Sequence, residues 1–193
     1  MKLVFATHNQ HKLREIQALL PPNIQLLSLD DIGCDEDIPE TATTIEDNAL
    51  LKVQYIQKHY HRNVFADDTG LEVQALNNAP GVYSARYAGE HKSDVDNVQL
   101  LLKNMEGISR REAQFKTVIA LCLEGVVYTF EGIAKGNIST TPIGTNGFGY
   151  DPIFIPENSD KTFAELTQDE KNRISHRGKA FEKLLDFLNQ KIQ

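Results

Sequence analysis

The sequence is poor in the residues that mark several classes of protein. Its 193 residues include no tryptophan and only two cysteines, which are too few and too isolated for a disulfide framework or a cysteine metal site. No apolar run approaches the length that crosses a membrane, and the run near the N-terminus is too short for a signal peptide. Internal repeats and low-complexity tracts are also absent. We therefore expect a soluble, cytoplasmic protein.

Positive charge is scarce as well. The chain has 20 lysines and arginines against 27 aspartates and glutamates, a formal net charge of -7. This excess of acid disfavours a broad electrostatic interaction with a nucleic acid polymer, although a few local lysines can still bind a small anion. With 40% hydrophobic residues, the chain can bury the core of one domain, which we expect to span residues 1–193 with two lobes.

Residues 64–73 are the stretch around which the rest of the chain is organised. A short apolar run leads into Asp67 and Asp68, and polar and apolar residues alternate after Gly70, which predicts strand, turn and strand. Successive side chains of a strand point to opposite faces, so the two carboxylates are expected to have different roles. One of them can hold a divalent cation or orient a water. The alternative is an Asp-Thr-Gly turn with solvated carboxylates.

The N-terminal segment predicts a strand, a polar loop and a helix. Residues 2–6 have a buried-strand pattern, residues 7–12 are polar, and the helix that follows ends at Pro21. The unpaired N–H groups at a helix start suit a phosphate. Lys12 lies in the first turn, where a cation is unfavourable for the helix itself. This position favours a ligand role for Lys12, and a solvated lysine is the alternative.

A second helix is predicted after the acidic loop of residues 30–40. Thr43 and Glu46 have the spacing of a capping box, and apolar residues follow at helical intervals. Glu40 therefore precedes a helix start. Lys52 lies about two turns into this helix, on the side of its apolar residues, so it either reaches over the sheet or extends along the apolar surface to solvent.

The second half of the chain predicts a mixed sheet and a loop rich in glycine. Residues 113–123 and 126–133 are β-rich runs joined by a two-residue hairpin, and their antiparallel pairing excludes a simple parallel doubly wound sheet. Residues 142–156 interleave glycines with aromatics, which can bring ring faces against a flat ligand. The alternative is a tight connection with its aromatics in the core.

Near the C-terminus, Ser175, His176 and Arg177 form a compact group of donors ahead of a long amphipathic helix. Histidine and arginine supply fixed N–H groups, which suit a base edge that carries carbonyl oxygens. A solvated helical turn is the alternative.

Taken together, these segments resemble one family, the inosine/xanthosine triphosphate pyrophosphatases, which remove deaminated purine nucleotides. The resemblance runs in order along nearly the whole chain. It rests on residues 7–12, Glu40-Thr41, Asn48-Ala49 with Lys52, and on residues 66–71, 80–87, 147–154 and 175–178.

The resemblance implies an α/β fold with an elongated mixed β-sheet flanked by helices, in two lobes with a central active-site cleft, and a homodimer. It implies hydrolysis of ITP, dITP or XTP between the α- and β-phosphates with Mg²⁺. Asp68 would act as the base, and Glu40 and Asp68 would hold the metal. The remaining implied contacts are Thr7, His8, Asn9, Gln10, His11, Lys12 and Lys52 for the phosphates, Thr69 for the substrate, Phe148, Gly149, Tyr150, Asp151 and Lys171 for the nucleoside, and His176 and Arg177 for the base.

Two other functions remain open at the level of sequence. One is a regulatory module that binds a nucleotide without cleaving it, although a pure phosphate binder has little use for Glu40 and Asp68 in the absence of metal. The other is a pyrophosphatase that acts on pyrimidine or other modified nucleotides. His176 and Arg177 argue against it, and a substrate panel separates the two cases.

Overall fold

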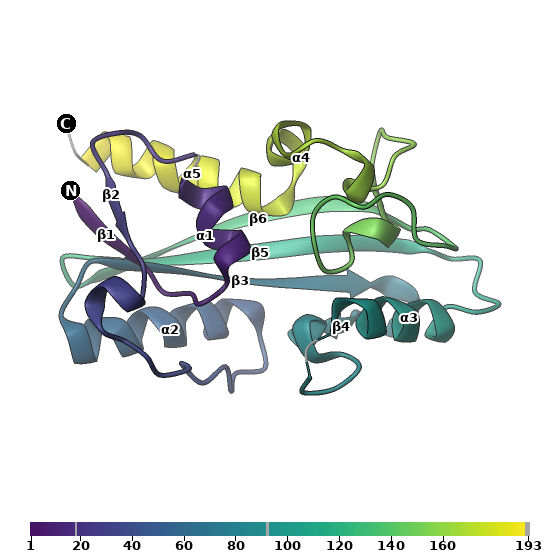
Figure 1. Ribbon diagram of the computed structural model, residues 1–193, viewed down its shortest axis with the longest axis horizontal. Helices are drawn as coiled ribbons and strands as arrows, with labels where there is room; N and C mark the ends of the chain where they lie inside the picture. The colour runs from purple at the N-terminus through teal and green to yellow at the C-terminus, as the bar shows by residue number, and fades with distance from the viewer. Residues whose placement is uncertain (18, 92, 192–193) are drawn as a thin grey trace. The chain divides into compact units, whose positions relative to one another are not determined.

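The computed structural model describes residues 1–17, 19–91 and 93–191 (Figure 1). The chain divides into two compact units. Unit 1 comprises Met1–Asp68, Val118–Glu131 and Ala180–Gln193, and unit 2 comprises Thr69–Thr117 and Gly132–Lys179. No helix in the described part of the chain is long and apolar enough to span a membrane.

The regular elements alternate between helix and strand in the first half of the chain. The helices are α1 (Gln10–Gln17), α2 (Ile45–Tyr60), α3 (Asp94–Asn104), α4 (Gln168–Ile174) and α5 (His176–Lys191). The strands are β1 (Lys2–Phe5), β2 (Gln25–Leu27), β3 (Val64–Val73), β4 (Ala79–Gly81), β5 (Glu112–Leu123), β6 (Val126–Ile138) and β7 (Phe154–Pro156).

The strands form one mixed sheet, as the sequence predicted. Its order is β2-β1-β3-β5-β6-β7, with β4 paired to β3. β1 runs parallel to β2 and to β3, whereas β3 with β4 and β6 with β7 are antiparallel. Glu124 and Gly125 link β5 to β6 with φ angles of 52° and 82°, the positive values that a two-residue hairpin requires.

The prediction of a turn at Asp67–Gly70 is wrong, because β3 is one continuous strand of 10 residues. β3 lies between β1 and β5 in the sheet, and nearly all of its residues are buried. β3 pairs with β1 at Val64 and Phe65 and with β4 at Leu71, Glu72 and Val73, so strand pairing before and after the Asp-Thr-Gly sequence outweighs its local turn preference. The carboxylates of Asp67 and Asp68 are therefore held on a rigid strand and are not solvated on a loop.

Unit 1 packs helices against both faces of its strands. In Figure 1, α2 lies on one side of these strands and α5 on the other. Phe5, Ile16, Phe65 and Phe181 share one core, so α1 and α5 cover the same face. The rings of Phe5 and Phe65 stack with centroids 4.5 Å apart.

The start of α2 lies one residue later than the sequence suggested. The cap is Thr44 and not Thr43, because the Thr44 side chain accepts a hydrogen bond from the backbone N–H of Asp47 at 3.0 Å. This start turns Ile45, Ala49 and Lys52 to the buried side of the helix. Of the two interpretations of Lys52, the one that places it over the sheet is correct.

Unit 2 has its own core, in which α3 packs with the strands and with the segments around β7. Phe115 of β5 lies at its centre, with its ring 4.7 Å from that of Phe154 and 4.5 Å from that of His176. Ser93 caps α3 by accepting from the N–H of Asp96. Thr162 and Glu165 form a capping box.

Candidate functional site

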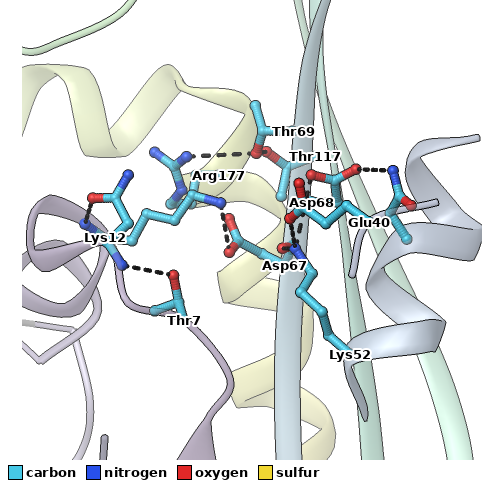
Figure 2. A network of polar contacts seen from close by, with 11 residues as sticks. Thr7, Lys12, Glu40, Lys52, Asp67, Asp68, Thr69, Thr117 and Arg177 are labelled. Atoms are coloured by element: carbon cyan, nitrogen blue, oxygen red, sulfur yellow. Dashed lines mark hydrogen bonds and ion pairs between the residues drawn. The ribbon is translucent and has the colours of Figure 1, made fainter. Parts of the chain in front are cut away.

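Asp67 and Asp68 point to opposite sides of β3 within unit 1, as expected for consecutive residues of a strand (Figure 2). On one side, Lys12 Nζ donates to Asp67 Oδ1 at 2.9 Å, and the Asp67 side chain is only 2% exposed. On the other side, Asp68 faces Lys52 and Glu40. These five residues, Lys12, Glu40, Lys52, Asp67 and Asp68, are called the acidic cluster below.

Lys52 lies at the centre of the acidic cluster. Its Nζ donates to Glu40 Oε1 at 2.9 Å and to the Asp67 backbone oxygen at 2.6 Å. The same atom is 3.8 Å from Asp68 Oδ1. The two carboxylates that were predicted to act together, Glu40 and Asp68, therefore converge on one ammonium group.

Charge in the acidic cluster is not evenly matched. Burial raises the pKa of the Asp68 carboxyl, and the nearby lysines only partly oppose this rise. Burial also acts against charge on Lys52, but the surrounding carboxylates, Asp68 first, outweigh it and raise the pKa of the Lys52 ammonium. Lys52 thus stays charged, while Asp68 is a buried carboxylate with a raised affinity for a proton. Such a group suits general base chemistry.

The loop between β1 and α1 presents polar groups on the same unit. Asn9 precedes α1, and its Oδ1 accepts from the N–H of Lys12 at 3.2 Å, while Thr7 Oγ1 accepts from the N–H of Asn9 at 3.1 Å. His8 Nε2 bonds with the Glu36 backbone oxygen at 3.2 Å. His8, Asn9 and Gln10 are exposed, and the side chain of His11 lies outside the described residues.

Glu40 and Asp68 are suited to hold a metal ion together with a ligand. Among the described residues there is no group of three or more His, Cys, Asp or Glu side chains placed to hold a metal. Mg²⁺ commonly uses only one or two carboxylates, with water and substrate phosphates as its other ligands. Two carboxylates gathered around an ammonium group provide hard oxygen donors and an excess of negative charge, so the donor set fits Mg²⁺ when phosphates complete it.

A second polar group lies within unit 2 and contains several of the other predicted residues. Lys171 Nζ donates to Asp151 Oδ2 at 2.7 Å, and both side chains are about 5% exposed or less. The same carboxylate oxygen accepts from the N–H of Phe148 at 2.9 Å. Lys171 Nζ and Arg177 Cζ lie 4.9 and 5.4 Å from the centroid of the Phe148 ring. Phe148, Asp151, Lys171 and Arg177 are called the aromatic cluster below.

The loop that carries the aromatic cluster is held at several points. Gly147 has a φ of 76°, and a Cβ there would collide with the Asp151 carboxylate, so only glycine fits. The N–H of Gly149 donates to Asp94 Oδ2 at 2.7 Å. Tyr150 donates its hydroxyl to the Ser84 backbone oxygen at 2.8 Å, and burial raises the pKa of the Tyr150 hydroxyl. The loop is thus an ordered platform beside Phe148.

The predicted base-reading residues are buried in unit 2. His176 and Arg177 are 3% and 4% exposed, which rules out a solvated helical turn. The His176 ring stacks on Phe115 with an interplanar angle of 14°. Arg177 Nη2 donates to Thr69 Oγ1 at 3.5 Å, and Thr69 Oγ1 is 2.7 Å from Thr117 Oγ1 (Figure 2).

Sequence reasoning missed the contribution of several residues. Asn48 donates to Asp68 Oδ2, and Thr117 bonds to Thr69, yet neither was assigned a role. The helical spacing of Asn48 with Lys52 was the available signal, since residues four apart lie on one face. Nothing local marks Thr117, because its partner is 48 residues away.

The mixed α/β fold and its two polar clusters belong to one class of protein: the chain is a member of the Ham1 family, which it matches over residues 3–187. The resemblance noted in the sequence is thereby confirmed. A dITP/XTP pyrophosphatase of Flavobacterium johnsoniae is 63% identical over 188 residues, which cover 97% of this chain and 98% of that protein. The dITP/XTP pyrophosphatase of Bacillus subtilis is 46% identical over 189 residues, 96% of each chain.

Solved structures agree with this assignment. The Ham1 protein of Staphylococcus aureus is 41% identical and superposes with a TM-score of 0.92, over 99% of this chain and all of that one. A nucleoside-triphosphatase / dITP/XTP pyrophosphatase of Mycobacterium abscessus is 46% identical with a TM-score of 0.80, over 96% of this chain and 99% of that one.

Proposed function

We propose that this protein hydrolyses the non-standard purine nucleotides ITP, dITP and XTP to the nucleoside monophosphate and pyrophosphate. The observation that carries the proposal is the convergence of Glu40 and Asp68 on the Lys52 ammonium, in a chain that is 63% identical to a dITP/XTP pyrophosphatase. Phosphoryl chemistry depends mainly on positioning and charge neutralisation, so no activated serine or cysteine is needed.

In this proposal, Asp68 is the catalytic base. Its raised pKa gives it an affinity for the proton of an attacking water, and its place within a continuous, largely buried strand fixes its direction. Lys12 and Lys52, together with Thr7, His8, Asn9, Gln10 and His11, would contact the triphosphate. Both lysines already lie against carboxylates in unit 1, so their ammonium groups are held in place before a phosphate arrives.

Glu40 and Asp68 would hold Mg²⁺ when the nucleotide is present. The bound ion would supply positive charge that offsets the charge of the phosphate oxygens. The protein itself positions the two carboxylates: Glu40 lies in the segment before α2, and Asp68 lies on β3. Lys52 keeps these carboxylates close together by bonding to Glu40 and to the backbone beside Asp68.

The aromatic cluster would bind the nucleoside. Phe148, Gly149, Tyr150, Asp151 and Lys171 form or support the platform, Thr69 would contact the substrate, and His176 and Arg177 would read the base. Hypoxanthine and xanthine carry an oxygen at ring position 6, which accepts hydrogen bonds, whereas adenine carries a donor amine there. An arginine donor facing adenine would be left unpaired, at a cost of roughly 1–3 kcal/mol for each buried unsatisfied group.

The proposal also includes the finer architecture that the resemblance implies. One domain with two lobes would enclose the active site in a central cleft, and the protein would be a homodimer in the cytoplasm. The supporting fact is that Asp68 of the acidic cluster is followed directly in β3 by Thr69, whose Oγ1 accepts from Arg177 of the aromatic cluster.

Pyrophosphate release with Mg²⁺ tests the proposal. The purified protein is given ITP, dITP, XTP, ATP and GTP in separate reactions, and monophosphate and pyrophosphate are measured. We expect the first three to be cleaved far faster than ATP and GTP. Equal cleavage of all five would contradict the proposed base reading. Tight binding of ITP without any product would instead favour a regulatory nucleotide binder.

A further inference from the structure

We propose that Asn48 is a positioning residue for the reaction, which fixes the direction of the Asp68 carboxylate and ties the segment after Glu40 to it. The inference rests on the proposed role of Asp68 as the base. It concerns contacts within unit 1 only.

The side-chain amide of Asn48 bridges two functional parts of unit 1. Asn48 is 1% exposed. Its Nδ2 donates to Asp68 Oδ2 at 3.3 Å, and its Oδ1 accepts from the backbone N–H of Ala42 at 3.0 Å. Ala42 follows Glu40 by two residues, so one amide connects the base to the segment that carries the second carboxylate.

The polarity of these two contacts allows only one orientation of the amide. The Ala42 N–H can only donate, so it must face the amide oxygen, and Nδ2 must then face Asp68. The hydrogen bond engages Oδ2 of the carboxylate. The other oxygen, Oδ1, is left on the side of Lys52, whose Nζ is 3.8 Å away. Asn48 therefore selects which oxygen of Asp68 faces the lysine and Glu40.

The backbone beneath Asn48 is rigid. Thr44 caps α2, and the N–H of Asn48 donates to the Thr44 backbone oxygen at 3.1 Å in the first turn. Ile45 and Ala49 anchor the same turn in the core. A short side chain on an anchored helix turn has little freedom, so it can hold Asp68 within the narrow range of positions that catalysis requires.

Unit 2 contains a matched control for this arrangement. Asn97 occupies the same position in α3, four residues after the cap Ser93, and is 2% exposed. Its Oδ1 accepts from the N–H of Ala88 at 2.7 Å, and its Nδ2 donates to the Ala85 backbone oxygen at 3.2 Å. Both asparagines thus tie a preceding loop to a helix, but only Asn48 also contacts a carboxylate with a proposed catalytic role.

The test compares Asn48→Asp and Asn48→Ala with Asn97→Asp and Asn97→Ala in the full-length protein. An aspartate keeps the oxygen that accepts from the loop N–H and removes the N–H donor. We expect all four variants to melt at lower temperature than the unsubstituted protein. The two Asn48 variants should lose about 100-fold in kcat for dITP, with KM within about threefold, because an acceptor or a gap beside Asp68 misdirects the base. The Asn97 variants should keep kcat within about twofold, a difference that a structural role alone would not produce.

Each outcome decides the matter. If the unsubstituted protein does not release pyrophosphate from dITP, the proposed function fails. If it does and the Asn48 variants keep its kcat, the positioning role fails while the proposed function stands. A similar loss of kcat in both pairs would also overturn the inference. If both Asn48 variants fail to fold while the Asn97 variants fold, Asn48 is structural and the inference is again overturned.

Discussion

Lys52 in unit 1 and Lys171 in unit 2 are both buried, 6% and 4% exposed, and both contact buried aspartates, yet their surroundings differ. Lys171 Nζ donates to Asp151 Oδ2 at 2.7 Å, and the backbone N–H of Phe148 donates to the same oxygen. Lys52 Nζ lies 2.9 Å from Glu40 Oε1 and 3.8 Å from Asp68 Oδ1, and it also donates a hydrogen bond to the backbone oxygen of Asp67.

The difference separates a structural ion pair from a reactive one. A buried ion pair that also accepts from a backbone N–H resists rearrangement, so the Lys171 pair holds the loop around Phe148. Several carboxylates around one ammonium leave negative charge uncompensated, which prepares the site for a cation. Burial raises the pKa of both Asp68 and Asp151, so the number of carboxylates, and not the pKa, distinguishes the two pairs. Substitutions at Lys52 and its partners should therefore change catalysis, and substitutions at the Lys171 pair should change stability.

Asp68→Asn should give the largest effect and tests the reactive side of this comparison. We expect kcat for dITP to fall about 1000-fold, since general base catalysis typically contributes 10²–10⁴-fold. Folding raises the pKa of Asp68, so the protonated carboxyl stabilises the folded protein relative to the unfolded chain. This contribution is complete below the unfolded pKa of Asp68 and is lost as the pH rises through the folded pKa. At pH 7 the neutral variant should therefore be at least as stable. Kinetics and thermal melting measure both effects, and near-normal turnover would contradict the role of Asp68.

Asp151→Asn should have the next largest effect, and on stability. Burial raises the pKa of the Asp151 carboxyl, as it does for Asp68, but Asp151 lies only 2.7 Å from the Lys171 ammonium. Removing the charge of this buried, directly bonded carboxylate costs about 3 kcal/mol of unfolding free energy. Urea unfolding monitored by circular dichroism measures this cost. If the midpoint were unchanged while kcat fell 100-fold or so, the division into a structural and a reactive pair would be wrong.

Lys52→Met should lower kcat for dITP by about 100-fold, because it removes one preorganised positive charge. It also removes the main charge that lowers the pKa of Asp68, so this pKa should rise further. A base must be deprotonated, and the acid limb of the profile of kcat/KM against pH should therefore move to higher pH. A limb that moved to lower pH would show that another group controls it.

Arg177→Leu should have the smallest of these effects and should change specificity. Loss of the donor should reduce the preference for ITP over ATP by about tenfold, which corresponds to about 1.4 kcal/mol. The ratio of kcat/KM for the two nucleotides measures it. Lys179→Leu, an exposed change two residues along α5 whose Nζ donates to the Ile133 backbone oxygen, is the control and should leave the ratio unchanged.

The sequence predicted the elements well wherever a local pattern determined them. The hairpin at Glu124 and Gly125 was found from the spacing of two β-rich runs, because it depends on residues within a few positions. The turn at Asp67–Gly70 was wrongly predicted for the complementary reason. Its extended form depends on pairing with neighbouring strands such as β5, which no local pattern reveals.

The residues of the candidate site could be identified from the sequence, but several of the contacts between them could not. The family resemblance singled out Glu40, Asp68 and Lys52, and the contacts of Lys52 with the other two agree with that choice. The pairing of Lys12 with Asp67 spans 55 residues, and the bond between Thr69 and Thr117 spans 48, so folding alone brings them together. The sequence likewise left open whether Lys52 reaches over the sheet or extends to solvent, and its burial in the folded protein shows that it lies over the sheet.

The continuity of β3 limits which sequence changes this protein can accept in evolution. Along Asp67, Asp68 and Thr69, adjacent positions serve different partners, namely Lys12, Lys52 with Asn48, and Thr117. Gain or loss of a single residue in this strand would exchange the sides of every side chain beyond that point. Divergence within β3 is therefore confined to substitution, while changes of length must fall in the connecting loops.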